Sequence, residues 1–153
     1  MSSFHEGNAM LLTFSDLSEG MIAQRSVLIG EEQVRSFVAL TADNAPVHVN
    51  ADHARSLGYD GPIAHGILVG SMYSQILGCE LPGSNTVIMK FTLDMLKPVS
   101  VGETIEYQVT VSRLFEATRS VALTLSARDS AGEQVSRGTA VCLLRNGPTL
   151  ETN

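Results

Sequence analysis

The stretch HGILVGSMYSQILG, residues 65–78, decides the fold of this chain. It is apolar nearly all round a helix, through the residues Ile67, Leu68, Met72, Ile76 and Leu77. A helix that is apolar on every side is a buried helix. Gly66 and Gly70 allow another backbone to approach closely, and Gly78 stops the run. We therefore expect a central buried helix from His65 to Gly78.

The chain after this helix alternates between apolar and polar residues with a period of two. This alternation predicts strands with one buried face. It recurs four times, at about 89–95, 105–111, 121–126 and 135–144. The turn SAGE separates the last two segments, so we expect an antiparallel meander of four strands.

The chain before the helix supplies one more strand and one more helix. Residues 21–29 alternate with a period of two, which predicts a short strand. Residues 31–41 carry apolar side chains at helical spacing behind two acidic residues that favour a helix N-terminus. A short helix, capped by Asn50 and closed by Gly58, is expected between this segment and the central helix.

These elements predict an α+β domain in which a five-stranded antiparallel sheet wraps one long helix. The 153 residues suit one domain, which we place at 20–145, with an N-terminal arm at 1–19 and a C-terminal tail at 146–153 that frays. In the arm, Leu11, Leu12 and Phe14 are the residues that could pack down. One helix covers too little of the sheet, so we expect a homodimer or a larger homo-oligomer.

The composition excludes several classes of partner. The formal charge is −6 and basic residues do not cluster, so nucleic acid and anionic membranes are not expected to bind. No apolar run is long enough to span a bilayer, and no secretory signal is present, which predicts a cytoplasmic protein. Cys79 and Cys142 lack the spacing of a metal or redox site, so we expect reduced thiols.

The candidate chemistry lies in the loop before the central helix. Asp43 and His48 are five residues apart in a segment stiffened by Pro46, which we expect to be a rigid loop and not a helix. Each residue alone has a structural interpretation, as a backbone cap or a turn residue. Together they can converge on one water molecule. The first amides of the central helix, from Gly66, can stabilise negative charge on a carbonyl oxygen, which indicates addition or elimination of water beside a carbonyl.

Other arrangements are weaker. His65 could be a neutral imidazole that satisfies local backbone groups, and Ser74 could be a serine bonded to its own helix. His48, Asp52 and His53 have only a weak resemblance to a metal site, and we expect no metal. Phosphate-loop, dinucleotide and serine-hydrolase motifs are absent from the sequence, and we expect no cofactor.

The residues FVALTADNAPVH, 37–48, and PIAHGIL, 62–68, resemble the MaoC-like (R)-specific enoyl-CoA hydratases of the hot-dog fold. The resemblance runs from about residue 20 to 144. It implies that Asp43 and His48 hold and activate a water molecule, that the Gly66 amide binds the thioester oxygen, and that Ser74 and His65 have supporting roles. It also implies a substrate carried by coenzyme A or an acyl carrier protein. In that family an asparagine usually precedes the proline, whereas here Ala45 stands there and Asn44 lies one residue earlier.

Three functions fit this resemblance. The favoured one is reversible hydration of a 2-enoyl thioester to an (R)-3-hydroxyacyl thioester. A hot-dog thioesterase would direct the water to the carbonyl carbon, and it does not require the paired histidine. A binding module would keep the fold and the acyl-thioester site without catalysis.

Overall fold

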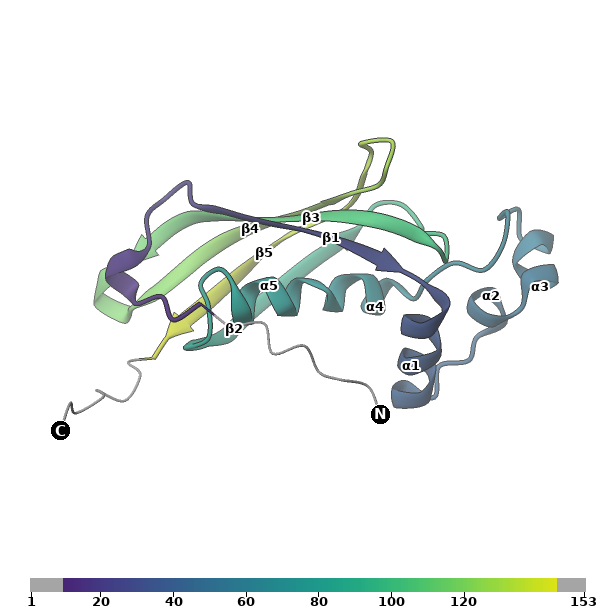
Figure 1. Cartoon of the computed structure of the whole chain (residues 1–153), viewed down its shortest axis with the longest axis horizontal. Coiled ribbons are helices and arrows are strands. Elements are labelled where there is room, and N and C mark those ends of the chain that lie inside the picture. The colour runs from purple at the N-terminus through teal and green to yellow at the C-terminus, as the bar shows by residue number, and fades with distance from the viewer. Residues whose placement is uncertain (1–9, 146–153) are drawn as a thin grey trace.

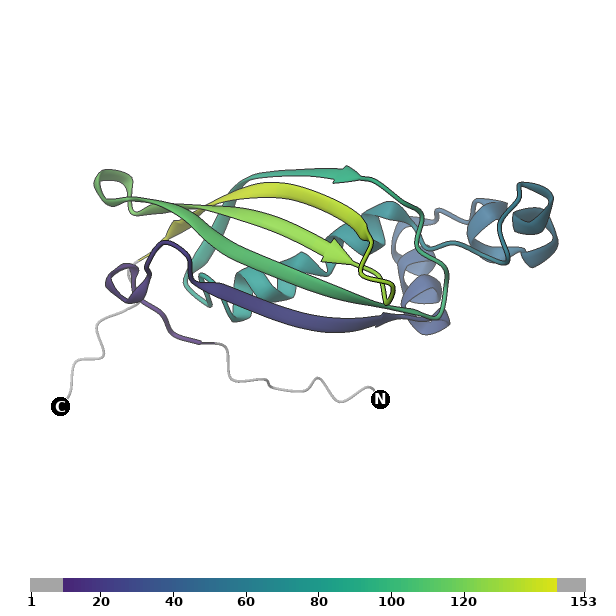
Figure 2. The same ribbon diagram turned by 90° about the horizontal axis from the view of Figure 1, so that it is seen from above.

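The central helical stretch lies along the concave side of a curved antiparallel sheet (Figure 1). The structure is a computed structural model and describes residues 10–145. Seen from above, the strands arch over the helices along their length (Figure 2). The strands are β1 Ile22–Ile29, β2 Thr86–Met95, β3 Glu103–Phe115, β4 Ser120–Arg128 and β5 Gln134–Leu144. The helices are α1 Glu31–Thr41, α2 Pro46–Val49, α3 Ala51–Ser56, α4 Gly66–Ser71 and α5 Tyr73–Cys79.

The sheet has the strand order β1-β3-β4-β5-β2, with every pair antiparallel. All five predicted strands are present, but the predicted four-strand meander is wrong, because β2 pairs with β5 and not with β3. Only β3, β4 and β5 form a meander. Alternation of apolar residues shows which face of a strand is buried and says nothing about its neighbour.

The core consists of the inward faces of the strands packed on the central helices. In β3 the residues Ile105, Tyr107, Val109 and Val111 are at most 1% exposed, and in β4 Val121, Leu123, Leu125 and Ala127 are at most 2% exposed. The polar residues between them face outward. This arrangement confirms the period of two in β3 and β4. The buried face predicted for β2 is wrong, because Met89 is 63% and Phe91 40% exposed and no residue of that strand is buried.

The central helix is broken at Met72 into α4 and α5. The Tyr107 hydroxyl donates a hydrogen bond to the Val69 carbonyl oxygen at 2.9 Å. A side chain that bonds to a helix carbonyl in this way accounts for a break in the helix. The predicted central helix is confirmed: α4 and α5 together cover residues 66–79, Met72 between them keeps helical angles with φ −65° and ψ −24°, and the end at Cys79 lies one residue beyond the predicted Gly78.

Close packing of α4 on β2 explains Gly70. A Cβ atom there would lie 2.9 Å from Leu93 Cδ2 and 3.3 Å from Met95 Cε, so a side chain does not fit without movement. The prediction that α4 is apolar and buried all round is wrong at Ile67, which is 71% exposed. Ile67 lies beside an open groove, described below, and not against the sheet.

Two buried tyrosines lie beside the break in the helix. The rings of Tyr73 and Tyr107 meet edge to face, with centroids 4.9 Å apart. The Tyr73 hydroxyl bonds to Ser136 Oγ at 3.1 Å, and burial raises the pKa of Tyr73 to about 12. Each phenol therefore has a polar partner inside the core.

The segment between α1 and α4 extends past the end of the sheet (Figure 1). The prediction of a loop over residues 43–49 is wrong for its second half, because Pro46 occupies the first position of the one-turn helix α2. Proline is well suited to that position, where its missing N–H has no helical acceptor. The Asn50 cap of α3 is confirmed: its Oδ1 accepts the His53 N–H at 2.9 Å.

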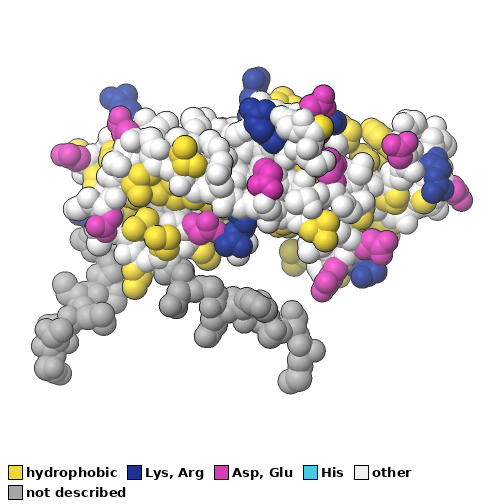
Figure 3. Space-filling view, turned by 45° about the horizontal axis from the view of Figure 1, so that its top comes forward, with side chains coloured by type: hydrophobic (Ala, Val, Ile, Leu, Met, Phe, Trp, Pro, Cys, Tyr) yellow, Lys and Arg dark blue, Asp and Glu magenta, His cyan; other side chains and the backbone are white. Residues whose placement is uncertain are grey.

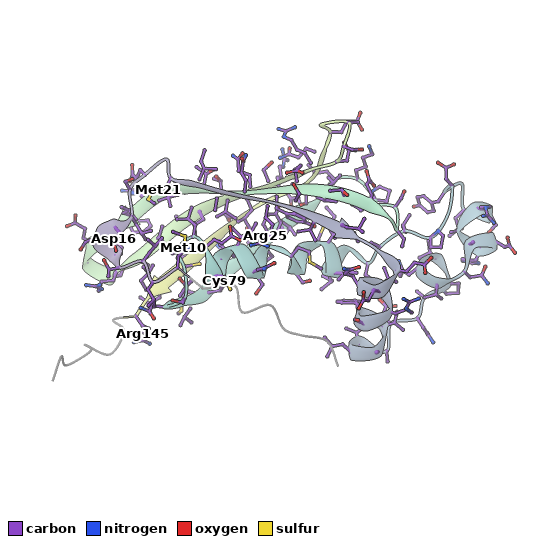
Figure 4. All side chains as sticks on the ribbon, viewed as in Figure 1. Met10, Asp16, Met21, Arg25, Cys79 and Arg145 are labelled. Carbon is purple, nitrogen blue, oxygen red and sulfur yellow. The ribbon has the colours of Figure 1, made fainter. Side chains whose placement is uncertain are left out.

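The described part of the N-terminal arm packs onto the domain. Leu12 and Phe14 are partly buried against the core as predicted, whereas Leu11 is 75% exposed. The Met10 N–H donates to the Cys79 carbonyl at the end of α5 (Figure 4). Residues 1–9 and the predicted tail at 146–153 lie outside the described residues.

Two further expectations concern the whole chain. Cys79 and Cys142 are both free thiols, and burial raises the pKa of Cys142 to about 11. Among residues 10–145, no helix combines the length and the apolar character needed to cross a membrane.

Candidate active site

Asp43 lies just beyond the end of α1, where Ala42 turns the chain with a φ of 60°. Its N–H donates to Thr41 Oγ1 at 3.2 Å, and its Oδ1 accepts the Ala45 N–H at 3.3 Å. The carboxylate thus forms the local backbone contact that its structural interpretation predicted. The side chain is nevertheless 52% exposed, which leaves oxygen lone pairs for a water or substrate.

His48 is held by its Nδ1 atom. Nδ1 lies 2.7 Å from the Ile63 carbonyl oxygen, which can only accept, so Nδ1 carries the proton and donates. In a neutral imidazole the other nitrogen, Nε2, is then an unprotonated acceptor. The Ile63 segment is itself anchored, because Ala64 N–H donates to Val99 O at 2.8 Å and Ile63 N–H to Val47 O at 3.2 Å.

His65 packs directly on His48. The two rings stack with centroids 3.8 Å apart and planes 29° apart, and His65 is only 3% exposed. Its Nε2 lies 2.9 Å from the Asp43 carbonyl oxygen. Phe37 of α1 contacts the same ring, with centroids 4.8 Å apart.

The three side chains form one cluster. One ligand-capable atom each from Asp43, His48 and His65 lies within 4.8 Å of the other two. A cation would need ligand lone pairs that converge. The two histidine rings are stacked, so the lone pairs of their nitrogens do not point at a common centre. One nitrogen of each ring is also already hydrogen-bonded to a carbonyl oxygen. The cluster as arranged is therefore not a preformed metal site.

A cavity of about 250 Å³ brings His48 and Gly66 together. Its other walls are mostly apolar and come from three separate parts of the chain: Ile63, Ala64, Val69, Met95, Leu96, Pro98, Val99 and Val135. Gly66 is the first residue of α4, so its N–H has no acceptor within the helix. The first residue of α4 and an imidazole thus line the same cavity.

Lys97 also lines this cavity, but its charge is already paired. Its Nζ donates to Asp129 Oδ2 at 2.6 Å and to Glu133 Oε2 at 2.5 Å. The hydrogen bond from Lys97 holds the pKa of Asp129 below its usual value. Because this charge is paired, the cavity is mainly apolar, with few polar groups of defined direction. Basic and acidic side chains are also interspersed on the face of the molecule drawn in Figure 3.

Ser74 lies on α5, away from this cavity. It lines a separate apolar groove of about 450 Å³ between the central helices and β2, together with Ile67, Gly70, Ser71, Ile88, Phe91, Leu93 and Met95. Met95 is common to the groove and the cavity. The structure thus brings together four of the five predicted site residues and places Ser74 at the neighbouring groove.

The sequence did not predict the cavity walls formed by the end of β2, the residues just after it, and β5. Met95, Leu96, Lys97 and Val135 lie 29 or more residues after Gly66, and no motif links them to it. They reach the cavity because Leu96 N–H bonds to Val135 O at 2.9 Å at one end of the β2–β5 pair.

Known proteins resemble this chain in sequence. The family model described as MaoC like domain matches residues 15–130. The chain is 32% identical over 131 residues to the (R)-specific enoyl-CoA hydratase of Rhodospirillum rubrum, covering 86% of this chain and 90% of that one. It is 31% identical over 133 residues to the (R)-specific enoyl-CoA hydratase of Aeromonas caviae, covering 87% and 99%.

A solved structure supports the same relationship. The (R)-hydratase from A. caviae involved in PHA biosynthesis matches with a TM-score of 0.82 at 32% identity, over 84% of this chain and 98% of that one. The sheet wrapped round a central helix is thus the hot-dog fold that the sequence predicted. The chain belongs to the MaoC-like family of hydratases and dehydratases.

Proposed function

We propose that this protein is an (R)-specific enoyl-CoA hydratase, which reversibly adds water to a trans-2-enoyl thioester to give an (R)-3-hydroxyacyl thioester. The observation that carries the proposal is a ring nitrogen of His48 within 4.8 Å of an Asp43 carboxylate oxygen, with Gly66, the first residue of α4, lining the same cavity as His48. The relatives named as (R)-specific enoyl-CoA hydratases support the substrate class and the stereochemistry.

The reaction follows from where these groups can hold water and charge. A carboxylate oxygen and a ring nitrogen less than 4.8 Å apart can bind one water molecule between them. The water oxygen bonds to the β carbon of the alkene while one of its protons passes to the Asp43–His48 pair. Electrons of the double bond move to the thioester oxygen, and the pair then delivers a proton to the α carbon.

The Gly66 N–H would stabilise the negative charge that develops on the thioester oxygen. Amides fixed toward a developing oxyanion act strongly because they need no reorganisation during the reaction. The apolar walls of the cavity exclude bulk water from the same point. The carrier of the acyl group is proposed to be coenzyme A, with an acyl carrier protein as the alternative.

Incubation with crotonyl-CoA tests the proposal. Loss of the conjugated alkene absorbance, with (R)-3-hydroxybutyryl-CoA as the chirally resolved product, is the expected result. Release of free thiol without alkene loss would instead identify a thioesterase. Binding of crotonyl-CoA with neither reaction would identify a non-catalytic module, and both of these outcomes would reject the hydratase.

We also propose that the protein is a homodimer formed over β2 and α4. Ile67 is 71% exposed and Phe91 40% exposed on either side of the apolar groove, an arrangement typical of a covered surface. Light scattering at micromolar concentration should give twice the 16.4 kDa of one chain. Ile67→Lys should shift the mass toward the monomer, whereas Leu40→Lys on α1 should not. A wild-type protein that is a stable monomer would contradict this proposal.

A further inference from the structure

His65 contacts both Asp43 and His48 and, like Asp43, does not line the cavity that His48 and Gly66 share. Its Nε2 lies 2.9 Å from the Asp43 carbonyl oxygen, and its ring stacks on His48 at 3.8 Å. It is also the residue directly before Gly66, and its own carbonyl accepts the Val69 N–H at 3.0 Å in the first turn of α4. We propose that His65 is a positioning residue that fixes the carboxylate, the imidazole and the α4 amide relative to one another. This inference rests on the proposed function.

The surroundings of His65 select one tautomer. Nε2 faces a carbonyl oxygen, which accepts but cannot donate, so Nε2 carries a proton. Nδ1 is buried and has no hydrogen-bond partner among residues 10–145. A proton on Nδ1 would be a buried donor without an acceptor, which is unfavourable. His65 is therefore a neutral imidazole protonated on Nε2.

The contact from His65 matters because the Asp43 loop has few other attachments. The remaining hydrogen bonds of Asp43 go to Thr41, the last residue of α1, and to Ala45, each two residues away along the chain. Among the described residues, the hydrogen bond from His65 is thus the one that joins Asp43 to a segment distant in sequence. The ring of Phe37 also packs against the ring of His65 and holds it in place. Loss of this link would let the carboxylate move relative to His48.

His65 is not placed to act on substrate itself. It is 3% exposed, it does not line the cavity, and its Nε2 lies 3.9 Å from Asp43 Oδ2, beyond hydrogen-bond distance. Its effect must therefore pass through Asp43, His48 and Gly66.

Two variants separate the donor from the ring. His65→Phe keeps an aromatic ring to stack on His48 but removes the donor to Asp43. His65→Gln keeps a donor, because its amide nitrogen is as many bonds from Cα as Nε2 of histidine. We expect His65→Phe to lower kcat on crotonyl-CoA by roughly 10- to 100-fold with KM nearly unchanged, since small displacements of reacting groups cost rates of that order. His65→Gln should recover a clear part of that loss.

The exposed His53 on α3 supplies the matched control. His53→Gln makes the same chemical change away from the site and should leave kcat and KM as in the wild type. Unchanged kcat in a folded His65→Phe protein would overturn the proposal. A His65→Gln protein no more active than His65→Phe would overturn the donor role, and a raised KM at unchanged kcat would mean that His65 binds substrate instead.

A spectroscopic measurement tests the geometry without any activity. Long-range ¹⁵N–¹H correlation spectra of the labelled wild-type protein at neutral pH should show His65 protonated on Nε2 and bare on Nδ1, with the signals identified by through-bond connection to the His65 backbone. A proton on Nδ1 would overturn the inference even if the variants fail to fold. Absent hydration by the wild type would reject the proposed function, while the tautomer would still test the contacts of His65.

Discussion

Asp43→Asn should lower the rate of crotonyl-CoA hydration by roughly 10²- to 10⁴-fold, equal to about 3 to 5 kcal/mol of barrier, with little change in stability. Asparagine keeps the Oδ1 that accepts the Ala45 N–H, so the loop retains its local bond. It loses only the charge and the basicity. Alkene loss and thermal melting of the same preparation measure the two effects.

His48→Asn should have an effect of the same size. Asparagine places its amide nitrogen near the position of Nδ1, so the donor to the Ile63 carbonyl survives while Nε2 disappears. The variant thus removes the proposed acid–base atom and keeps the structural bond.

The double variant separates catalysis from structure. Because Asp43 and His48 act on one water molecule, Asp43→Asn with His48→Asn should be hardly slower than the worse single variant. If the two residues were only structural, these variants, which keep the local hydrogen bonds, would leave both the unfolding free energy and the turnover nearly intact. Stable and fully active single variants would therefore reject the pair.

Gly66→Val should lower turnover by roughly 10²-fold or more, the usual effect of losing one oxyanion donor. A Cβ atom at Gly66 would lie 3.5 Å from Met95 Cγ, an ordinary contact, so the added side chain projects into the cavity without a backbone clash. Its branched methyl groups would occupy the space in which the thioester oxygen approaches the amide.

Gly78→Val is the matched control for Gly66→Val. Gly78 lies inside α5, and a Cβ atom there meets no atom within 4 Å. This control should fold and turn over as the wild type does, with folding followed by circular dichroism. Full activity in a folded Gly66→Val protein would remove the oxyanion role from this amide.

Much of the fold could be predicted because it is encoded in local patterns. Alternating residues marked all five strands, and Asn50 marked the cap of α3 through its side-chain oxygen. The pairing of β2 with β5 could not be predicted, because it depends on the path of the chain after Met95. The break at Met72 could not be predicted either, because it depends on the hydroxyl of Tyr107, 35 residues further along the chain.

The candidate site was predictable where its residues are close in sequence. Asp43 and His48 share one short loop, and the cluster with His65 agrees with the expectation that they converge. The stacking of His65 on His48 could not be predicted, because Ile63 and Val99 fix how the two segments meet. Ser74 follows Gly66 by two turns of helix, and the course of β2 beside α4 and α5 puts it at the separate groove.

The edge-to-face tyrosines provide this protein with an internal optical probe. The sequence contains three tyrosines and no tryptophan, so its near-ultraviolet absorption comes almost entirely from phenol rings. Tyr73 and Tyr107 are fixed and 4.9 Å apart where β3 meets the break in the central helix. Their circular dichroism band therefore reports on packing beside α4 without any label. Burial raises the pKa of both phenols, so this band stays that of the neutral rings well above neutral pH.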